Sequence, residues 1–367
     1  MRSLLLSGLF MFLFCHCNAQ VKSPVSQVQA VQGISRVQAD SVHALISRFP
    51  NQTQFAIALI HGSEVSYYGV LRANDTLLNI SNEDSLFEIG SISKVFTSSL
   101  LAQMAEEGKL NPEDPVSAYL PFPLKDSIRI SFQQLANHTS GLPRLPPSMF
   151  MASLMHPDNP YKTYDREKLI KYMREDMSLQ REAGSAYEYS NLGAGMLGFV
   201  LEEISGQTYE QLLQQKISIP LGMQHTTTDR ARAGELLVKG LSPTGEVTSN
   251  WDLAALMGAG GILSSSQDLS KFILANFDTT RHAFNLQRKQ TFKVNESLGL
   301  ALGWHIMYRP SGESWYWHNG GTGGYRSSMV LDVPNRKGVV LLSNMSAGYY
   351  LAGEIDQLSF FLLEQMK

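Results

Sequence analysis

The sequence predicts an α+β fold, in which helices flank an antiparallel sheet built from both ends of the chain. Short apolar runs rich in β-forming residues lie near the two ends, at 55–60, 64–69, 315–317, 327–332 and 339–343. His61-Gly62-Ser63 is typical of a hairpin turn between the first two runs, and Pro334-Asn335 marks a turn between the last two. Residues 126–250 are poorer in such runs, so we expect a mainly helical domain to be inserted there.

Helical periodicity predicts the remaining elements. Val42, Leu45 and Ile46 recur at the spacing of one helix face, which predicts a first helix that ends before Pro50. Further helices are expected at 167–177, 192–204 and 355–363. We therefore predict one domain over residues 37–367, with the helical insertion inside it.

The first nineteen residues, 1–19, differ from the rest of the chain. Arg2 precedes an apolar run of about a dozen residues, and the small residue Ala19 follows it, an order typical of a secretory signal peptide. The run is shorter than the ~20 residues that a membrane-spanning helix needs. We expect cleavage after Ala19, a flexible polar leader over 20–36, and a periplasmic or secreted mature protein. Lipid attachment at Cys15 is a less favoured alternative, because the bulky Phe14 precedes it.

Loss of this segment would change what the protein can do. Both cysteines, Cys15 and Cys17, lie in it, so the mature protein would have no disulfide, no thiolate nucleophile and no cysteine-based metal site. The formal net charge of −3 would become −4, because the one charge lost is that of Arg2. No basic stripe is present in the sequence, so we expect no nucleic-acid partner.

Three short patterns carry the candidate chemistry, and the first is Ser91-Ile92-Ser93-Lys94. It begins a helical pattern that continues to Glu107 and that Gly108 ends. Residues three apart share a helix face, so Ser91 and Lys94 would lie side by side, near free backbone N–H groups that favour negative charge. By itself this motif is more often a capping serine with a solvated lysine.

The second pattern is Tyr189-Ser190-Asn191, and the third is His318-Asn319-Gly320-Gly321-Thr322-Gly323-Gly324. A tyrosine phenol can relay a proton and an amide can hydrogen-bond a substrate, although a half-buried tyrosine and a capping asparagine are the simpler interpretation of the second pattern alone. The four glycines of the third pattern leave backbone N–H groups open to a substrate, although a flexible hairpin loop would look the same.

Taken in order, the three patterns resemble the S-x-x-K, Y-x-N and K-T-G motifs of class C serine β-lactamases and of related D,D-peptidases and esterases. Linking stretches resemble the same family within residues 40–345, at 87–91, 111–115, 135–143, 220–223 and 258–268. The resemblance implies a β-lactamase/transpeptidase-like fold and hydrolysis through an acyl-enzyme. It implies a β-lactamase or a D-alanyl-D-alanine carboxypeptidase-type enzyme, with a small molecule or a cell-wall peptide as substrate, and it leaves an esterase or a D-amino-acid peptidase open.

The resemblance also implies roles for individual residues. Ser91 would be the nucleophile, with Lys94 or Tyr189 as its general base. The side chain of Asn191 would bind the acyl side of the substrate or hold Lys94. Backbone N–H groups of Ser91 and Gly321 would form the oxyanion hole.

The third motif departs from the family pattern at its first two positions. His318 stands where the family has lysine, and Asn319 stands where it has threonine. Histidine is mostly neutral at pH 7, so a fixed positive charge is missing there, and Arg326 could replace it. We expect His318, Gly320, Gly321 and Arg326 to contact the substrate.

Two other classes of function are alternatives to a hydrolase. A non-catalytic penicillin-binding or sensor module would need none of Ser91, Lys94 and Tyr189, so their joint presence favours an enzyme. A metalloenzyme is disfavoured because no H-E-x-x-H pattern occurs, and His138 and His305 are interpreted as structural or surface residues. We expect no cofactor, no metal and no membrane span, and the sequence leaves the oligomeric state open.

Overall fold

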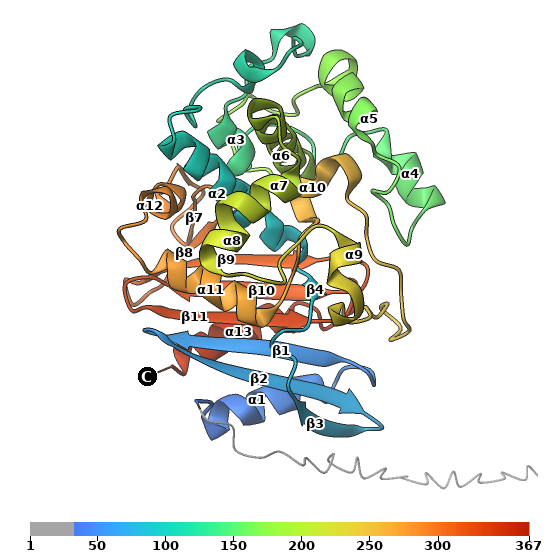
Figure 1. The fold of residues 1–367 in the computed structure, drawn as a ribbon, viewed down its shortest axis with the longest axis vertical. Coiled ribbons are helices and arrows are strands. Elements are labelled where there is room, and N and C mark those ends of the chain that lie inside the picture. Colours follow the sequence, from blue (N-terminus) through green and yellow to red (C-terminus); the bar gives the residue numbers. More distant parts are fainter. Residues whose placement is uncertain (1–32, 367) are drawn as a thin grey trace, which may run out of the picture.

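The structure is a computed structural model that describes residues 33–366. The predicted signal peptide and the predicted leader up to residue 32 lie outside the described residues. Within them, the chain forms a large antiparallel sheet with helices on both faces, and further helices extend away from one of these faces (Figure 1). The predicted α+β class is confirmed.

The sheet is built from both ends of the described chain. Its nine strands run in the order β3-β2-β1-β11-β10-β9-β8-β7-β6. The bounds are β1 Gln54–His61, β2 Glu64–Ala73, β3 Thr76–Ile80, β6 Phe292–Lys293, β7 Leu298–Leu300, β8 His305–Tyr308, β9 Ser314–Gly321, β10 Arg326–Asp332 and β11 Lys337–Ser343. β1 pairs with β11 from Phe55↔Ser343 to His61↔Lys337, which joins the two ends at the centre of the sheet.

Residues of β1 alternate between the two faces of the sheet. Phe55, Ile57 and Leu59 belong to the core beneath α1 (Arg36–Ile46) and α13 (Glu354–Glu364). The intervening Ala56, Ala58 and Ile60 belong to the larger core on the opposite face, under the other helices. Because both faces are covered, the strand is apolar at nearly every position, which explains the continuous run in the sequence.

Helices and loops make up nearly all of the chain between β3 and β6. The α-helices on this stretch are α2 Ser93–Glu106, α3 Phe132–Ala136, α4 Met149–Met155, α5 Arg166–Lys171, α6 Asn191–Ser205, α7 Tyr209–Leu213, α8 Ile219–Leu221, α9 Arg230–Ala233, α10 Met257–Gly260, α11 Ser266–Asn276 and α12 His282–Arg288. Two short strands, β4 (Phe87–Glu88) and β5 (Leu263–Ser264), pair with each other inside it. The helical stretch is wider than the predicted insertion at 126–250, whose limits stay a prediction.

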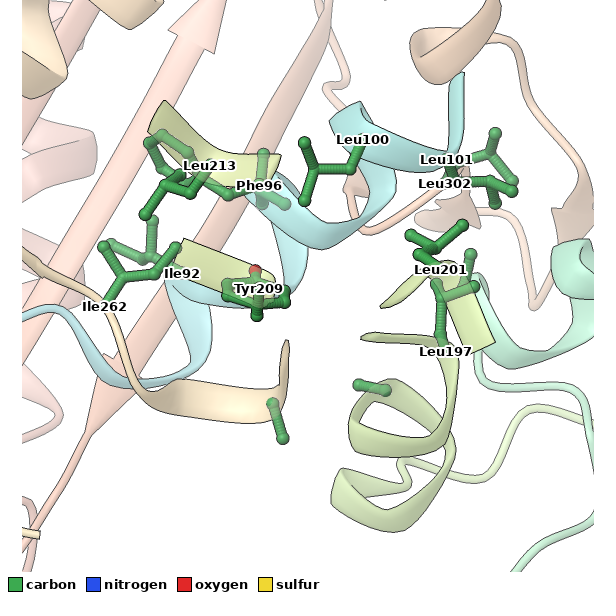
Figure 2. Close-up of a cluster of buried hydrophobic side chains, with 14 of the residues drawn as sticks. Ile92, Phe96, Leu100, Leu101, Leu197, Leu201, Tyr209, Leu213, Ile262 and Leu302 are labelled. Atoms are coloured by element: carbon green, nitrogen blue, oxygen red, sulfur yellow. The ribbon is translucent and has the colours of Figure 1, made fainter. Parts of the chain in front are cut away.

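Helix α2 lies in the larger core and begins two residues after Ser91. Phe96, Leu100 and Leu101 of α2 pack against residues of α6 and α7, among them Leu201 and Leu213 (Figure 2). A helix that is buried all round needs partners for its polar side chains. The Thr97 hydroxyl meets this need by donating to the Gly258 carbonyl at 2.7 Å and by a contact with the Tyr209 hydroxyl at 2.7 Å. This packing gives the start of α2 a rigid base.

The predicted helices are present with small changes at their ends. The predicted 167–177 helix ends as an α-helix at Lys171 and continues as a wider π-turn over Tyr172–Asp176. The last helix extends one residue beyond the prediction at each end. Among the described residues, no helix combines the length and the apolar character needed to cross a bilayer.

Candidate active site

Ser91 and Lys94 lie together where a short 3₁₀ turn, η1 (Gly90–Ile92), leads into α2. Lys94 Nζ donates to Ser91 Oγ at 2.9 Å and to the Ala259 carbonyl at 2.7 Å. Lys94 is only 2% exposed, and this burial, with a smaller effect of Arg144, holds the pKa of its ammonium group well below the usual range. A neutral amine has a lone pair free to accept the proton of Ser91.

Tyr189 completes this group from the other side. Its phenol hydrogen-bonds Ser91, and Lys94 Nζ lies 4.9 Å from the centre of its ring. Burial raises the pKa of the Tyr189 phenol, and the hydrogen bond with Ser91 offsets only part of that rise. A phenol with a raised pKa keeps its proton near pH 7. The electrostatics therefore favour Lys94 as the base and Tyr189 as a proton relay.

Asn191 is the first residue of α6 and faces the same cavity as Ser91. Ser190 caps the helix by accepting from the Gly193 N–H at 2.8 Å, and its own hydroxyl donates to the Pro143 carbonyl at 2.7 Å. Asn191 Nδ2 donates to the Tyr161 hydroxyl at 3.0 Å. Its buried Oδ1 has no hydrogen-bond partner among residues 33–366, so it is an acceptor available to a substrate N–H.

The glycines of the third motif let β9 approach the turn that carries Ser91. A Cβ on Gly320 would lie 1.9 Å from the Ile89 carbonyl oxygen, and a Cβ on Gly90 would lie 2.6 Å from Gly321 N. Gly90 also has a φ of +52°, a conformation that side chains disfavour. The Ser327 hydroxyl holds the same contact by donating to the Ile89 carbonyl at 2.8 Å. Gly321 N is thus placed beside the nucleophile turn, whereas Gly320 lies behind the cavity wall.

His318 is fully inside the protein and does not line the cavity. It is 1% exposed, its ring centre lies 5.2 Å from that of His305, and its Nδ1 donates to the Asn319 carbonyl at 2.6 Å. Burial is the main cause that lowers the pKa of His318 well below its usual value, and the pKa of His305 falls to about 4 for the same reason. Both rings are therefore neutral near pH 7.

A third buried histidine, His138, supports Tyr189. Its Nδ1 accepts from the Ser190 N–H at 3.2 Å, and its ring centre lies 4.4 Å from that of Tyr189. Burial also lowers its pKa well below the usual range. The expectation that His138 and His305 are structural fits this placement, with the addition that His138 positions the candidate relay.

The structure does not bring Arg326 to the cavity. Its guanidinium group forms an ion pair with Asp356 of α13, and Asn319 Nδ2 donates to the same carboxylate at 2.8 Å. Arg326 alternates with Ser327 along β10, so it projects toward α13 while Ser327 projects toward Ile89. Arg326 thus does not replace the charge that is missing at His318, because its own charge is already neutralised on the other face of the sheet.

A cavity of about 430 Å³ opens above Ser91. Two sets of lining residues form two walls of this cavity. The sheet wall consists of Gly321–Gly323 and Ser346–Gly348, and the helical wall consists of Arg144, Tyr161 and Asn191. This volume lies in the range of small-molecule sites.

Sequence reasoning missed several cavity residues. Trp251, Leu253, Ser346–Gly348, Tyr161 and Arg144 line the cavity, yet none of them lies in a catalytic motif. Arg144 directly follows the family-like stretch 135–143, so that stretch was the available signal. Among residues 33–366, no group of three or more His, Cys, Asp or Glu side chains is arranged to hold a metal ion.

Comparison with known proteins places this site in a family. The sequence matches the family model described as Beta-lactamase over residues 42–353. The chain belongs to the β-lactamase family. It is similar to the D-alanyl-D-alanine-carboxypeptidase/endopeptidase AmpH of Escherichia coli K12, with 30% identity over 307 residues that cover 76% of each protein. The β-lactamase family assigned from the three motifs is thus confirmed, and the chain is a serine hydrolase of that family.

Solved structures agree on the fold of this β-lactamase-family chain. The β-lactamase/D-alanine carboxypeptidase of Pseudomonas syringae superposes with a TM-score of 0.76 at 21% identity, covering 90% of this chain and 98% of the other. The octameric penicillin-binding protein homologue of Pyrococcus abyssi also reaches 0.76, at 23% identity, covering 89% of this chain and 77% of the other. At these identities the likeness concerns the fold alone.

Proposed function

We propose that this serine hydrolase acts on D-alanyl peptides through an acyl-enzyme on Ser91. The observation that carries the proposal is the 2.9 Å hydrogen bond between Lys94 Nζ and Ser91 Oγ, formed by a buried lysine beneath a cavity of ligand size. The choice of a D-alanyl peptide is supported by the similarity to AmpH, which is named for that activity.

In the first half of the reaction, Ser91 Oγ attacks the carbonyl carbon while its proton passes to the neutral amine of Lys94. The negative charge on the carbonyl oxygen is stabilised by the backbone N–H groups of Ser91 and Gly321, each worth about 10²–10³ in rate. The C–N bond then breaks, and the leaving nitrogen takes a proton that passes from Lys94 through the Tyr189 phenol. The product is an ester on Ser91 and a free amine.

In the second half, water attacks the ester carbon and its proton passes to Lys94. The C–O bond to Ser91 breaks, and Ser91 Oγ recovers a proton as the acid leaves. The positions of Lys94 and Tyr189 serve both halves without a second base.

Export is part of the proposal, and one experiment addresses export and catalysis together. The whole coding sequence is expressed with its own N-terminus, and the protein is purified from the periplasm or the medium. We expect its intact mass to be that of a chain whose first residue is Gln20. We expect release of D-alanine from a peptide ending in D-alanyl-D-alanine, with Ser91→Ala lowering the rate by about 10³-fold or more.

Ser41→Ala is the matched control, because Ser41 lies in α1 on the opposite face of the sheet. It should leave the rate unchanged. D-Alanine release that survives Ser91→Ala would refute the nucleophile. Mass spectrometry with a penicillin then separates two related activities: a persistent adduct supports a D,D-peptidase, whereas rapid consumption without an adduct identifies a β-lactamase. An adduct without any peptide turnover would identify a penicillin-binding sensor.

A further inference from the structure

One charged side chain lines the cavity above Ser91, and the proposed reaction does not use it. Arg144 is exposed and belongs to the helical wall, and no Asp, Glu or Lys is among the described residues that line the cavity. The structure shows no ion pair between Arg144 and any acidic group of residues 33–366. A guanidinium group at the mouth of a catalytic cavity, without an acidic partner, is suited to bind an anion from the substrate.

The fold holds this arginine in place. Its carbonyl accepts from the Leu192 N–H at 3.1 Å, which fixes its backbone against the first turn of α6. Its guanidinium carbon lies 5.2 Å from the centre of the Tyr189 ring, at the distance of a cation–π contact. Arg144 is therefore held both at its backbone and at its guanidinium group, which contacts the same ring as Lys94 Nζ.

The opposite side of the cavity offers no competing cation. His318 is buried and neutral, and the charge of Arg326 is neutralised by Asp356. Among the described residues that line the cavity, Arg144 is therefore the one cation that an entering carboxylate can meet. The sheet wall can offer such a group only backbone N–H groups and hydroxyls.

The neighbours of Arg144 indicate which half of the substrate it meets. Asn191, on the same wall, presents a buried Oδ1 without a partner in the described chain, which suits the N–H of an acyl-side amide. The Arg144 carbonyl is hydrogen-bonded to the N–H of Leu192, the residue that follows Asn191. The Asn191 side chain and the guanidinium group are therefore neighbours, and the same half of the substrate would approach both. We propose that Arg144 is a specificity residue that selects substrates with a carboxylate on the acyl half. This inference rests on the proposed function, because it assumes acyl transfer to Ser91.

Three synthetic thioesters, each assayed with the natural protein, test this inference. The first two share the neutral leaving group methyl thioglycolate and differ only in the acyl half, N-succinyl-D-alanyl against the uncharged N-succinamoyl-D-alanyl. The third joins the succinamoyl acyl half to free thioglycolate, which moves the carboxylate to the leaving group. Thiol release gives kcat/KM for each, and ratios between substrates cancel any effect of a substitution on Lys94.

We expect the succinyl substrate to be preferred over the succinamoyl one by about tenfold at low salt. The preference should shrink as salt is added, since Arg144 is exposed. Arg144→Gln should bring the ratio to about one, and Arg144→Lys should keep part of it. Arg129→Gln is the matched control, because Arg129 is also exposed but does not line the cavity, and it should keep the full ratio.

A ratio near one in the natural protein, or a preference that survives Arg144→Gln, would overturn the inference and leave the proposed function intact. A dependence on Arg144 that follows the leaving-group carboxylate would also overturn it. If none of the three thioesters is cleaved in a Ser91-dependent way, the proposed function fails, and the inference fails with it.

Discussion

The two walls of the cavity present polarity in different ways. The sheet wall, Gly321–Gly323 with Ser346–Gly348, offers backbone groups and hydroxyls, and the nearby cation Arg326 is paired with Asp356. The helical wall offers side chains, among them the unpaired guanidinium group of Arg144. Close contacts leave no room for a Cβ at Gly320, behind the sheet wall, or at Gly321 and Gly323 within it, whereas every residue of the helical wall carries a side chain. Catalytic geometry therefore depends on the sheet wall, and selectivity can reside in the helical wall.

The largest expected effect comes from Gly320→Ala, which changes the strand directly behind the sheet wall. The added Cβ would lie 1.9 Å from the Ile89 carbonyl oxygen, so the strand and the nucleophile turn must separate. We expect the free energy of unfolding to fall by about 3 kcal/mol, with activity lost toward every substrate alike. Denaturant unfolding and thioester kinetics measure both effects.

Gly353→Ala is the control for this substitution, because a Cβ there meets no atom within 4 Å. It should change neither stability nor kinetics appreciably. A Gly320→Ala protein with normal stability and activity would mean that the sheet wall is not constrained as described.

A smaller effect is expected from Arg326→Met, which tests whether this cation, paired with Asp356 outside the cavity, is structural. Asp356 is 7% exposed, and its partner Arg326 lowers a pKa that burial otherwise raises. Loss of the partner should lower the free energy of unfolding by about 2–3 kcal/mol at pH 8. The folded-state pKa of Asp356 then lies still further above its unfolded value. The loss of stability relative to the natural protein should therefore shrink as the pH falls and the carboxyl group takes a proton.

A control variant and one further measurement on Arg326→Met sharpen the comparison. Arg36→Met removes a highly exposed ion pair with Asp40 and should have little effect on stability. The preference of Arg326→Met for an acyl-half carboxylate should equal that of the natural protein. A loss of that preference would place substrate recognition on the sheet wall after all.

The smallest expected effect is a shift in the pH profile caused by Arg144→Gln. Lys94 must be neutral to accept the Ser91 proton, so kcat/KM should fall as the pH drops through the pKa of Lys94. Burial lowers that pKa most and Arg144 lowers it further, so removal of Arg144 should raise the pKa and move the acid limb to higher pH. Burial lowers the pKa values of His138, His305 and His318 as well, so these rings are neutral near pH 7.

The uncharged succinamoyl thioester is the substrate for this profile, since it makes no ion pair with Arg144. Arg129→Gln should leave the limb in place. An acid limb that moves to lower pH in Arg144→Gln would contradict the assignment of Lys94 as the base.

Much of the fold could be predicted because it follows from local pattern. The β1–β2 hairpin, the helix after Ser91 and the α6 helix are each encoded by a continuous stretch of sequence with a turn or helix-end signal beside it. A sheet built from both ends of the chain could also be predicted, since strand-forming sequence lies at both ends, but the specific pairing of β1 with β11 comes from the structure.

The positions of two charged residues near the site could not be predicted, because they depend on contacts between segments that are distant in sequence. Arg326 was expected near the substrate because it is close to His318 in sequence, yet its partner Asp356 lies on α13 and on the opposite face of the sheet. Arg144 carries no motif of its own, and only the packing of its segment against α6 brings it over Tyr189. Neither placement can be read from spacing, because each is decided by which elements meet in three dimensions.

The pairing of β1 with β11 has a consequence for the order of synthesis. A ribosome completes the serine and the lysine of the first motif early, but the strand that closes on β1 and the helix that supplies Asp356 are among the last described segments to be made. Long-range pairing of this kind forms only after the intervening chain is available. The nascent chain therefore carries Ser91 and Lys94 through most of translation without Gly321 beside them, and the site can be complete only once the final strands and α13 are available to dock.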